Sequence, residues 1–273
     1  LWENATRYFY KNHPYGRPII GYENTIKKIS IKTMRNYYKK YYQPNNAILI
    51  VCGNFEKEKV KKLISKYFSK IKSKRDKKIE YPYQKYFPER EFRVLRKKIQ
   101  TTYVLNFTKI PNATHDLMPS LLILDYILFQ GNNSFINQKL VLEKKLCYRV
   151  SGGVYLRKMP SVFIFQFFPA KKVRAEDIIQ TYRILLKKLI NHKDLKKMIE
   201  KAKKFLITDF YKGLEKVNGL SSTIGWGTIL KSPEYVINLY KRANKVSLNQ
   251  IINSIRFLLK ETQGTFVLKP EKK

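Results

Sequence analysis

Apolar residues recur along this chain at spacings that predict an alternation of helices and strands. The clearest helical pattern runs from Val60 to Phe68, where apolar positions at i, i+3, i+4, i+7 and i+8 are separated by lysines. Similar spacing predicts helices over residues 1–11, 30–42, 117–129, 135–145, 175–190, 195–214 and 248–260. Continuous or alternating apolar runs predict strands over residues 47–53, 99–107, 146–156, 161–168 and 264–268, and the Gly/Ser-rich stretch 219–227 predicts a turn. We therefore expect a protein that contains both helices and strands.

A change in composition divides the chain into two parts. Residues 72–91 hold a run of basic side chains followed by Pro82 and Pro88, which is typical of a solvated linker. We expect residues 1–71 to belong to a first domain and residues 92–273 to form a second.

An internal repeat relates the two parts. Residues 29–51 align without gaps with residues 246–268, at a fixed offset of 217 positions. In each copy a serine precedes a helical pattern, and a short polar turn leads from that helix into a strand. Two unrelated helix–strand units would also give a match of this length. If the domains are duplicated, the first would lack a segment of about 120 residues on its N-terminal side.

An ordered corner interrupts the helical patterns early in the chain. Residues 13–23 read HPYGRPIIGYE, and their two prolines and two glycines cannot continue a helix. His13 in this corner is a candidate catalytic histidine, but the other two, His115 and His192, are far away in sequence. We interpret His13 as structural, and His115 and His192 as exposed residues of a loop and a helix end.

The charge of the chain is extreme, with 56 Lys+Arg against 20 Asp+Glu and a formal net charge of +36. Such a balance is found in proteins that bind nucleic acids or acidic membranes. Here the lysines are spread over nearly every predicted helix and no nucleic-acid-binding motif accompanies them. A solvated basic surface is therefore favoured over a nucleic-acid-binding module, which remains the third-ranked functional hypothesis.

Neither membrane insertion nor cysteine chemistry is indicated. No apolar run reaches the roughly 20 residues that span a bilayer, and no signal peptide is recognisable, so we expect a soluble protein in a compartment that the sequence does not define. Cys52 and Cys147 lack metal-ligand spacing and lie in or beside apolar strands, so we expect both to be buried.

Several of these stretches together resemble the pitrilysin/insulinase-type zinc metallopeptidases, the inverzincin family that includes mitochondrial processing peptidase. The stretches are HPYGRPIIGYE, the following YYQPNNAILIVCGNF, and LDYILFQGNNSFINQKLVLEKKLCYRVSGG further along. The resemblance covers nearly the whole chain, as the latter part of an N-terminal domain followed by a C-terminal domain. It implies duplicated α+β domains, each an antiparallel sheet with helices packed on one face, the first domain being incomplete.

The resemblance also implies zinc chemistry that this chain does not carry by itself. The family binds zinc through a helical H-x-x-E-H motif and a later glutamate, which leave one position for a water whose pKa the metal lowers. The chain contains no H-x-x-E-H. By family order the motif would lie before Leu1, so we expect no zinc on this chain and no activity from it alone.

The same resemblance suggests candidate substrate-binding residues. In the family an arginine and a tyrosine seven residues apart polarise the substrate carbonyl; Tyr148 matches the tyrosine, whereas Val141 stands at the arginine position. Arg149 would point to the opposite face of a strand. Tyr148 could equally be a packed strand residue, and Gly152 and Gly153 could admit a peptide or mark a bulge.

Two functional hypotheses follow. The first is part of a zinc metalloendopeptidase that encloses and cleaves peptides or unfolded proteins between its domains, with the zinc supplied by a missing segment or a partner. The second is a non-catalytic, peptide-binding subunit of a two-chain peptidase, which the absent arginine favours.

Overall fold

A five-stranded sheet organises the second part of the chain in the computed structural model, which describes residues 1–11, 13–72, 91–261 and 263–271. The strands are β1 (Glu91–Lys97), β2 (Tyr103–Ile110), β3 (Cys147–Tyr155), β4 (Ser161–Pro169) and β5 (Gln263–Pro270). Their order across the sheet is β1-β5-β2-β4-β3. The pairs β2–β4, β3–β4 and β2–β5 are antiparallel, as expected, whereas β1 and β5 at the other edge run parallel.

Both faces of the central strands are buried, which explains their continuous apolar sequence. On β4, Phe163, Phe165 and Phe167 belong to the core beneath the main helix layer. The alternate residues Val162 and Ile164 belong to a second core on the opposite face.

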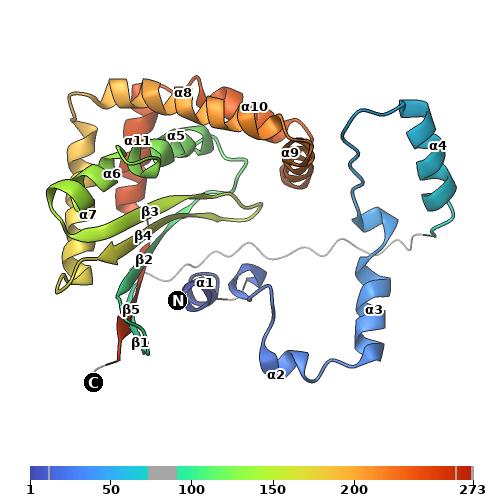
Figure 1. Cartoon of the computed structure of the whole chain (residues 1–273), viewed down its shortest axis with the longest axis horizontal. Helices are drawn as coiled ribbons and strands as arrows, with labels where there is room; N and C mark the ends of the chain where they lie inside the picture. The colour runs from blue at the N-terminus through green and yellow to red at the C-terminus, as the bar shows by residue number, and fades with distance from the viewer. Residues whose placement is uncertain (12, 73–90, 262, 272–273) are drawn as a thin grey trace.

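The main helix layer covers one face of the sheet (Figure 1). It contains α5 (Met118–Phe129), α7 (Ala175–Ile190), α8 (Leu195–Leu214), α9 (Val217–Leu230), α10 (Tyr235–Ala243) and α11 (Leu248–Lys260). Helix α5 is apolar on nearly every side, because it contacts β3 as well as α8, α10 and α11. The predicted helix over residues 135–145 is α6 (Phe135–Asn137) followed by the π-helical turn η3 (Gln138–Glu143).

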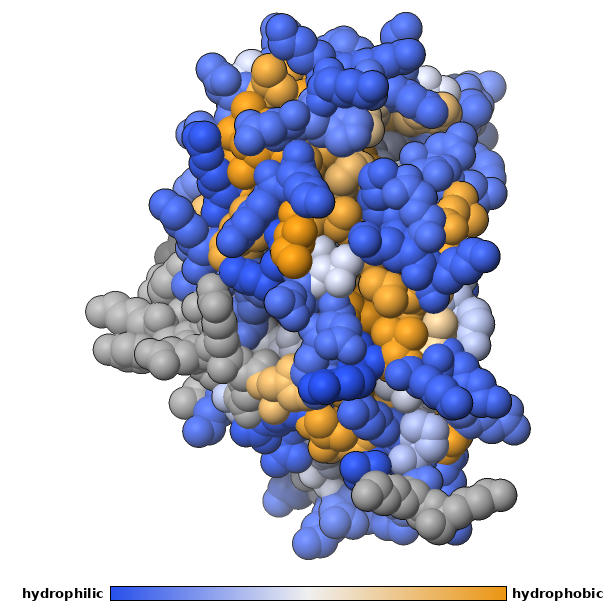
Figure 2. Space-filling model, turned by 90° about the vertical axis from the view of Figure 1, so that its left-hand side faces the viewer, coloured by the Kyte–Doolittle hydropathy of each residue, from blue (hydrophilic) through white to orange (hydrophobic). Residues whose placement is uncertain are grey.

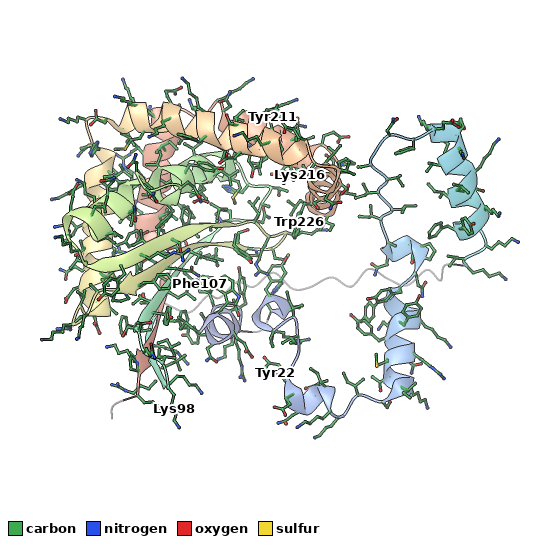
Figure 3. The ribbon with its side chains drawn as sticks, in the orientation of Figure 1. Tyr22, Lys98, Phe107, Tyr211, Lys216 and Trp226 are labelled. Carbon is green, nitrogen blue, oxygen red and sulfur yellow. The ribbon has the colours of Figure 1, made fainter. Side chains whose placement is uncertain are left out.

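Helix α1 (Trp2–Phe9) adds a second, smaller layer on the opposite face of the sheet (Figure 1). Phe107 of β2 lies against it (Figure 3), with its ring centroid 5.3 Å from that of Trp2 and 5.5 Å from that of Phe9. The helix pattern at the start of the chain therefore docks on the sheet of the second part.

The histidine-proline-glycine corner is a packed connection, as its composition predicts. His13 is buried and precedes a 3-10 turn, η1 (Pro14–Gly16). A Cβ at Gly16 would lie 2.7 Å from the Tyr10 carbonyl oxygen, so this position requires glycine. Just before the corner, the hydroxyl of Tyr10 donates to the Pro160 carbonyl at 3.0 Å and ties the end of α1 to the β3–β4 turn.

The next segment extends away from the sheet (Figure 1). It contains α2 (Glu23–Ile26), α3 (Ile31–Tyr41), the 3-10 turn η2 (Pro44–Asn46) and α4 (Lys57–Phe68), and none of these elements has a buried residue. We call residues 23–71 the arm. Large hydrophobic side chains on the arm, among them Met34, Leu49 and Tyr67, are exposed.

The predicted strand over residues 47–53 is wrong for this structure. The segment is extended without strand pairing, its Leu49 is exposed, and Cys52 is only half-buried, whereas Cys147 is buried as expected. A strand needs neighbours for its N–H and C=O groups, and no described strand lies beside this segment.

The internal repeat has a structural counterpart. Ser30 accepts a hydrogen bond from the Thr33 N–H at 3.1 Å at the start of α3, and Ser247 accepts one from the Gln250 N–H at 3.3 Å at the start of α11. The copies differ in their surroundings. Helix α11 and strand β5 are packed into the second part, whereas α3 has no buried residue and residues 47–53 reach the second part through Ile50, whose side chain lies 3.2 Å from the position of a Cβ at Gly225 of α9.

Other sequence expectations need correction. The predicted turn over residues 219–227 lies inside α9, whose glycines allow close backbone approach: a Cβ at Gly219 would collide with the Gly213 carbonyl oxygen. Strand β1 and helix α10 were not predicted, and β2 begins four residues later than expected. The linker prediction lies almost entirely outside the described residues.

The surface agrees with the mixed pattern of the sequence. On the face shown in Figure 2, hydrophobic residues lie in separate patches between hydrophilic ones. Within the described ranges, no helix combines the length and the apolar composition that crossing a membrane requires.

Candidate functional site

Strand β3 forms one edge of the sheet and carries three of the residues singled out in the sequence. It pairs with β4 on one side, and no described strand lies on its other side. A free strand edge offers N–H and C=O groups to an extended peptide. The candidate site is therefore the open edge of β3 and the side chains next to it.

Tyr148 lies at the start of this edge, at a β-bulge. The register with β4 shifts between Cys147 and Arg149, and the Tyr148 side chain is 65% exposed. Its hydroxyl accepts a hydrogen bond from the Lys171 N–H at 3.2 Å. The bulge interrupts the regular strand geometry on which the expected alternation of Tyr148 and Arg149 rests, and both residues are exposed.

Val141 lies on η3 and packs, half-buried, against the main core. The aliphatic side chain fills space between elements and cannot donate hydrogen bonds as an arginine would. The structure therefore gives this position a packing role.

Gly152 and Gly153 lie in continuous register opposite Phe165 and Ile164, so they mark no bulge. A Cβ at Gly152 would lie 2.5 Å from the Ile164 carbonyl oxygen and 2.6 Å from the Phe129 ring. A Cβ at Gly153 would lie 2.8 Å from a carboxylate oxygen of Asp125. The two glycines allow α5 to approach the edge strand closely, and their role in substrate binding remains a prediction.

Asp125 of α5 is a site residue that the sequence reasoning missed. Its Oδ2 accepts a hydrogen bond from the Val154 N–H at 3.2 Å, and its Oδ1 accepts one from the Gln130 side chain at 3.1 Å. Burial raises the pKa of Asp125 to about 6, against the opposing effect of these two hydrogen bonds. The signal was present in the sequence as a lone carboxylate in an otherwise apolar helix.

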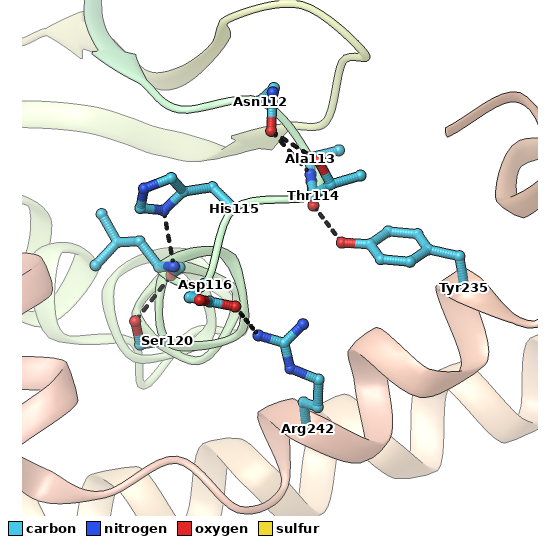
Figure 4. Close-up of polar contacts among 9 residues, drawn as sticks. Asn112, Ala113, Thr114, His115, Asp116, Ser120, Tyr235 and Arg242 are labelled. Carbon is cyan, nitrogen blue, oxygen red and sulfur yellow. Dashed lines mark hydrogen bonds and ion pairs between the residues drawn. The ribbon is translucent and has the colours of Figure 1, made fainter. Parts of the chain in front are cut away.

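The three histidines share one structural role. Each accepts a hydrogen bond through Nδ1 from the backbone N–H two residues later: His13 from Tyr15, His115 from Leu117 and His192 from Asp194, at 3.1 to 3.2 Å. Figure 4 shows this turn at His115, just before α5, flanked by the Tyr235–Ala113 and Arg242–Asp116 contacts. Burial and the neighbouring Arg157 guanidinium lower the pKa of His13.

No metal site is assembled from these groups. Among the residues that the structure describes, no three His, Cys, Asp or Glu side chains are grouped so that they could hold a metal ion. The donor set present therefore does not fit the zinc that the family resemblance implies, and the expectation that zinc lies outside this chain remains a prediction.

The structure thus brings Gly152 and Gly153 together with Asp125 at one end of the β3 edge. Tyr148 lies on the same strand at its other end, next to Lys171. His13, His115 and His192 are not part of this edge.

Comparisons with known proteins agree with this architecture. Residues 28–206 match the family model described as the peptidase M16 inactive domain. The chain is 26% identical over 269 residues to the zinc protease PqqE of Helicobacter pylori, covering 97% of this chain and 60% of that protein.

Solved structures show the same fold. A protease from Helicobacter pylori superposes with a TM-score of 0.87 at 24% identity, covering 97% of this chain and 65% of that one. A peptidase M16 inactive domain from Pseudomonas fluorescens superposes with a TM-score of 0.83 at 15% identity, covering 99% and 65%.

The chain spans about 60% of the length of the curated relative. The resemblance on which the sequence reasoning rested is confirmed, because the family model covers most of the chain, from the arm to the middle of α8. The chain belongs to the pitrilysin/insulinase-type peptidases of family M16, and matches their inactive domain.

Proposed function

We propose that this chain is the peptide-holding part of a larger zinc metallopeptidase, and that the catalytic zinc is bound by a segment outside these 273 residues. The observation that carries this proposal is the open edge of β3, the strand that holds an exposed tyrosine and two glycines. A relative named as a zinc protease supports zinc in the complete protein.

An extended peptide would add to β3 as a further strand. The Val154 N–H is already bound by Asp125, so the N–H and C=O groups available to a peptide lie between Tyr148 and Gly152. Main-chain hydrogen bonds do not depend on the side chains of the peptide, so many peptide sequences can bind in this way. This suits a substrate class of unfolded peptides. Tyr148 would then donate from its hydroxyl to a peptide carbonyl as negative charge develops on that oxygen.

Zinc in the family site would supply an activated water for peptide hydrolysis. The residues of this chain would bind and orient the peptide and exclude water from it. The metal-binding segment could precede this chain in one polypeptide or belong to a partner subunit, and we favour the first arrangement as the leading hypothesis.

A second candidate function is a non-catalytic subunit that holds peptides for a separate zinc-bearing subunit. The presence of Val141 at the arginine position favours it, because the chain would then bind the carbonyl through Tyr148 alone. The coding sequence upstream of Leu1 distinguishes the two. An in-frame H-x-x-E-H some 100 or more residues earlier supports the first, on the scale set by the repeat.

Peptide binding is tested directly by fluorescence anisotropy with a labelled unfolded peptide. Two matched peptides are N-methylated at alternate residues, one at the odd positions and the other at the even positions. In an extended peptide, successive N–H groups point to opposite edges, so only one of the two peptides loses the N–H groups that would face β3. We expect one methylated peptide to lose binding at least about tenfold and the other to bind as before. Equal binding by both would contradict strand addition.

Zinc content is tested on the same chain. After dialysis against zinc-free buffer, we expect far less than one zinc per chain by elemental analysis. Stoichiometric tight zinc would contradict the assignment of the metal to another segment.

A further inference from the structure

A cavity of about 440 Å³ lies between the C-terminal end of α5, the loop that follows it and α8. Its size falls within the range typical of small-molecule sites. No residue of β3 lines it, so it is distinct from the peptide-binding edge proposed above. Its wall mixes aromatic side chains, such as Phe135 and Phe205, with the amide side chains of the loop.

Two opposite charges stand at separate points of the cavity wall. Lys201 and Asp209, both on α8, are the charged residues that line it. They are eight residues apart, which places them about 12 Å apart along the helix axis. Lys201 forms no salt bridge with a carboxylate in the described part of the chain, and its Nζ lies 5.7 Å from the centroid of the Phe205 ring.

Asp209 is held in place within this wall. Its Oδ2 accepts a hydrogen bond from the hydroxyl of Tyr126 at 3.1 Å. A carboxylate has further lone pairs on both oxygens, so Asp209 keeps acceptor capacity for a cation while Tyr126 fixes its orientation.

We propose that this cavity binds a short zwitterionic peptide, with the terminal carboxylate at Lys201 and the terminal ammonium at Asp209. An extended chain advances 3.3–3.6 Å per residue, so the separation of the two charges corresponds to about three or four residues. Amide side chains of the loop bind the peptide backbone between the two ends. This proposal does not depend on strand addition at β3.

The test is isothermal titration calorimetry of the 273-residue chain with unblocked tri-alanine. We expect saturable binding with a Kd below about 1 mM. N-acetylation and C-terminal amidation should each weaken binding by about tenfold or more, because each removes one charge-assisted contact.

Substitutions assign each end of the peptide to a residue. In the Lys201→Met variant, amidation of the peptide should cause no further loss of affinity. In the Asp209→Asn variant, acetylation of the peptide should cause no further loss of affinity. Lys204→Met is the matched control, since this lysine is on α8 outside the cavity wall and should bind tri-alanine normally.

Three results would overturn the proposal: no saturation at about 10 mM peptide, equal binding of the doubly blocked peptide, or the same loss on blocking in the variants as in the unchanged chain. Circular dichroism of each variant establishes that a loss of binding does not arise from unfolding.

Discussion

Asp125 Oδ2 accepts a hydrogen bond at 3.2 Å from the backbone N–H of Val154, which ties the main helix layer to the edge strand of the sheet. The same carboxylate occupies the space that a side chain at Gly153 would need. A half-buried acid thus closes one end of the β3 edge and defines where an added peptide would stop.

This contact predicts a specific pH dependence of stability. Burial raises the pKa of Asp125 from 3.8 to about 6 in the folded chain, so the folded state binds this proton more tightly than the unfolded state. The stabilisation from protonated Asp125 is complete below pH 3.8 and is lost as the pH rises to about 6. The loss amounts to at most about 3 kcal/mol.

The measurement is urea denaturation of the chain and of Asp125→Asn between pH 4.5 and 7.5. Asparagine does not titrate, so the variant should lack this loss and gain stability relative to the original chain at the upper end. Asp194→Asn, an exposed control, should keep the original pH profile. An identical profile for Asp125→Asn would contradict the role of burial.

The packing of Gly152 gives a second prediction. Gly152→Ala places a methyl group 2.5 Å from a backbone oxygen of β4 and 2.6 Å from the Phe129 ring, so strand and helix must separate. We expect a loss of about 2–3 kcal/mol in the free energy of unfolding, measured by chemical denaturation.

The control is Gly213→Ala, where a Cβ would meet no atom of the described residues within 4 Å. Near the end of α8, alanine should be neutral or stabilise by up to about 1 kcal/mol. If Gly152→Ala unfolded like the original chain but bound peptide poorly, the glycine would serve binding and not packing.

The sequence predicted the second part of the fold better than the first. The apolar run of β4 and the helical spacing of α7, α8 and α11 match the structure, because neighbours on both faces turn these patterns into buried surfaces. Residues 47–53 carry an equally strong strand pattern and form no strand. A hydrophobic pattern indicates which side chains a segment can bury. The conformation of that segment also depends on which partners are present to pair with it.

The candidate site was only partly predictable for a related reason. Tyr148 and the glycines could be located by resemblance, but the bulge at Tyr148 and the approach of α5 to Gly153 arise from contacts between segments far apart in sequence. Helix α9 was missed because its glycines are typical of turns, and their helical role depends on close contacts such as that between Gly219 and Gly213.

A third prediction concerns the Tyr148 hydroxyl. In a complete, zinc-loaded peptidase, Tyr148→Phe should reduce kcat by about 100-fold, because a donor to the developing oxyanion is lost while the ring remains. The KM for peptide should change little, which separates this role from simple packing. Steady-state kinetics with a quenched fluorescent peptide provides the measurement.

The matched control for this substitution is Tyr211→Phe, which removes the hydroxyl of an exposed tyrosine on α8. Its kcat should equal that of the original enzyme. An unchanged kcat in Tyr148→Phe would leave the tyrosine as a strand residue whose hydroxyl accepts the Lys171 N–H and does nothing further.

The two copies of the repeat give the last prediction, because equivalent positions have opposite surroundings. Ile251 of α11 is completely buried, whereas Met34, its counterpart on α3, is 63% exposed. In this chain, Ile251→Ala should cost about 2–5 kcal/mol and Met34→Ala less than about 0.5 kcal/mol in the free energy of unfolding.

We propose that a preceding segment, folded like β1, β2 and α5, covers the arm in the longer protein. There Met34→Ala should destabilise by about 2 kcal/mol or more. An equally small effect in both forms would contradict this covering segment.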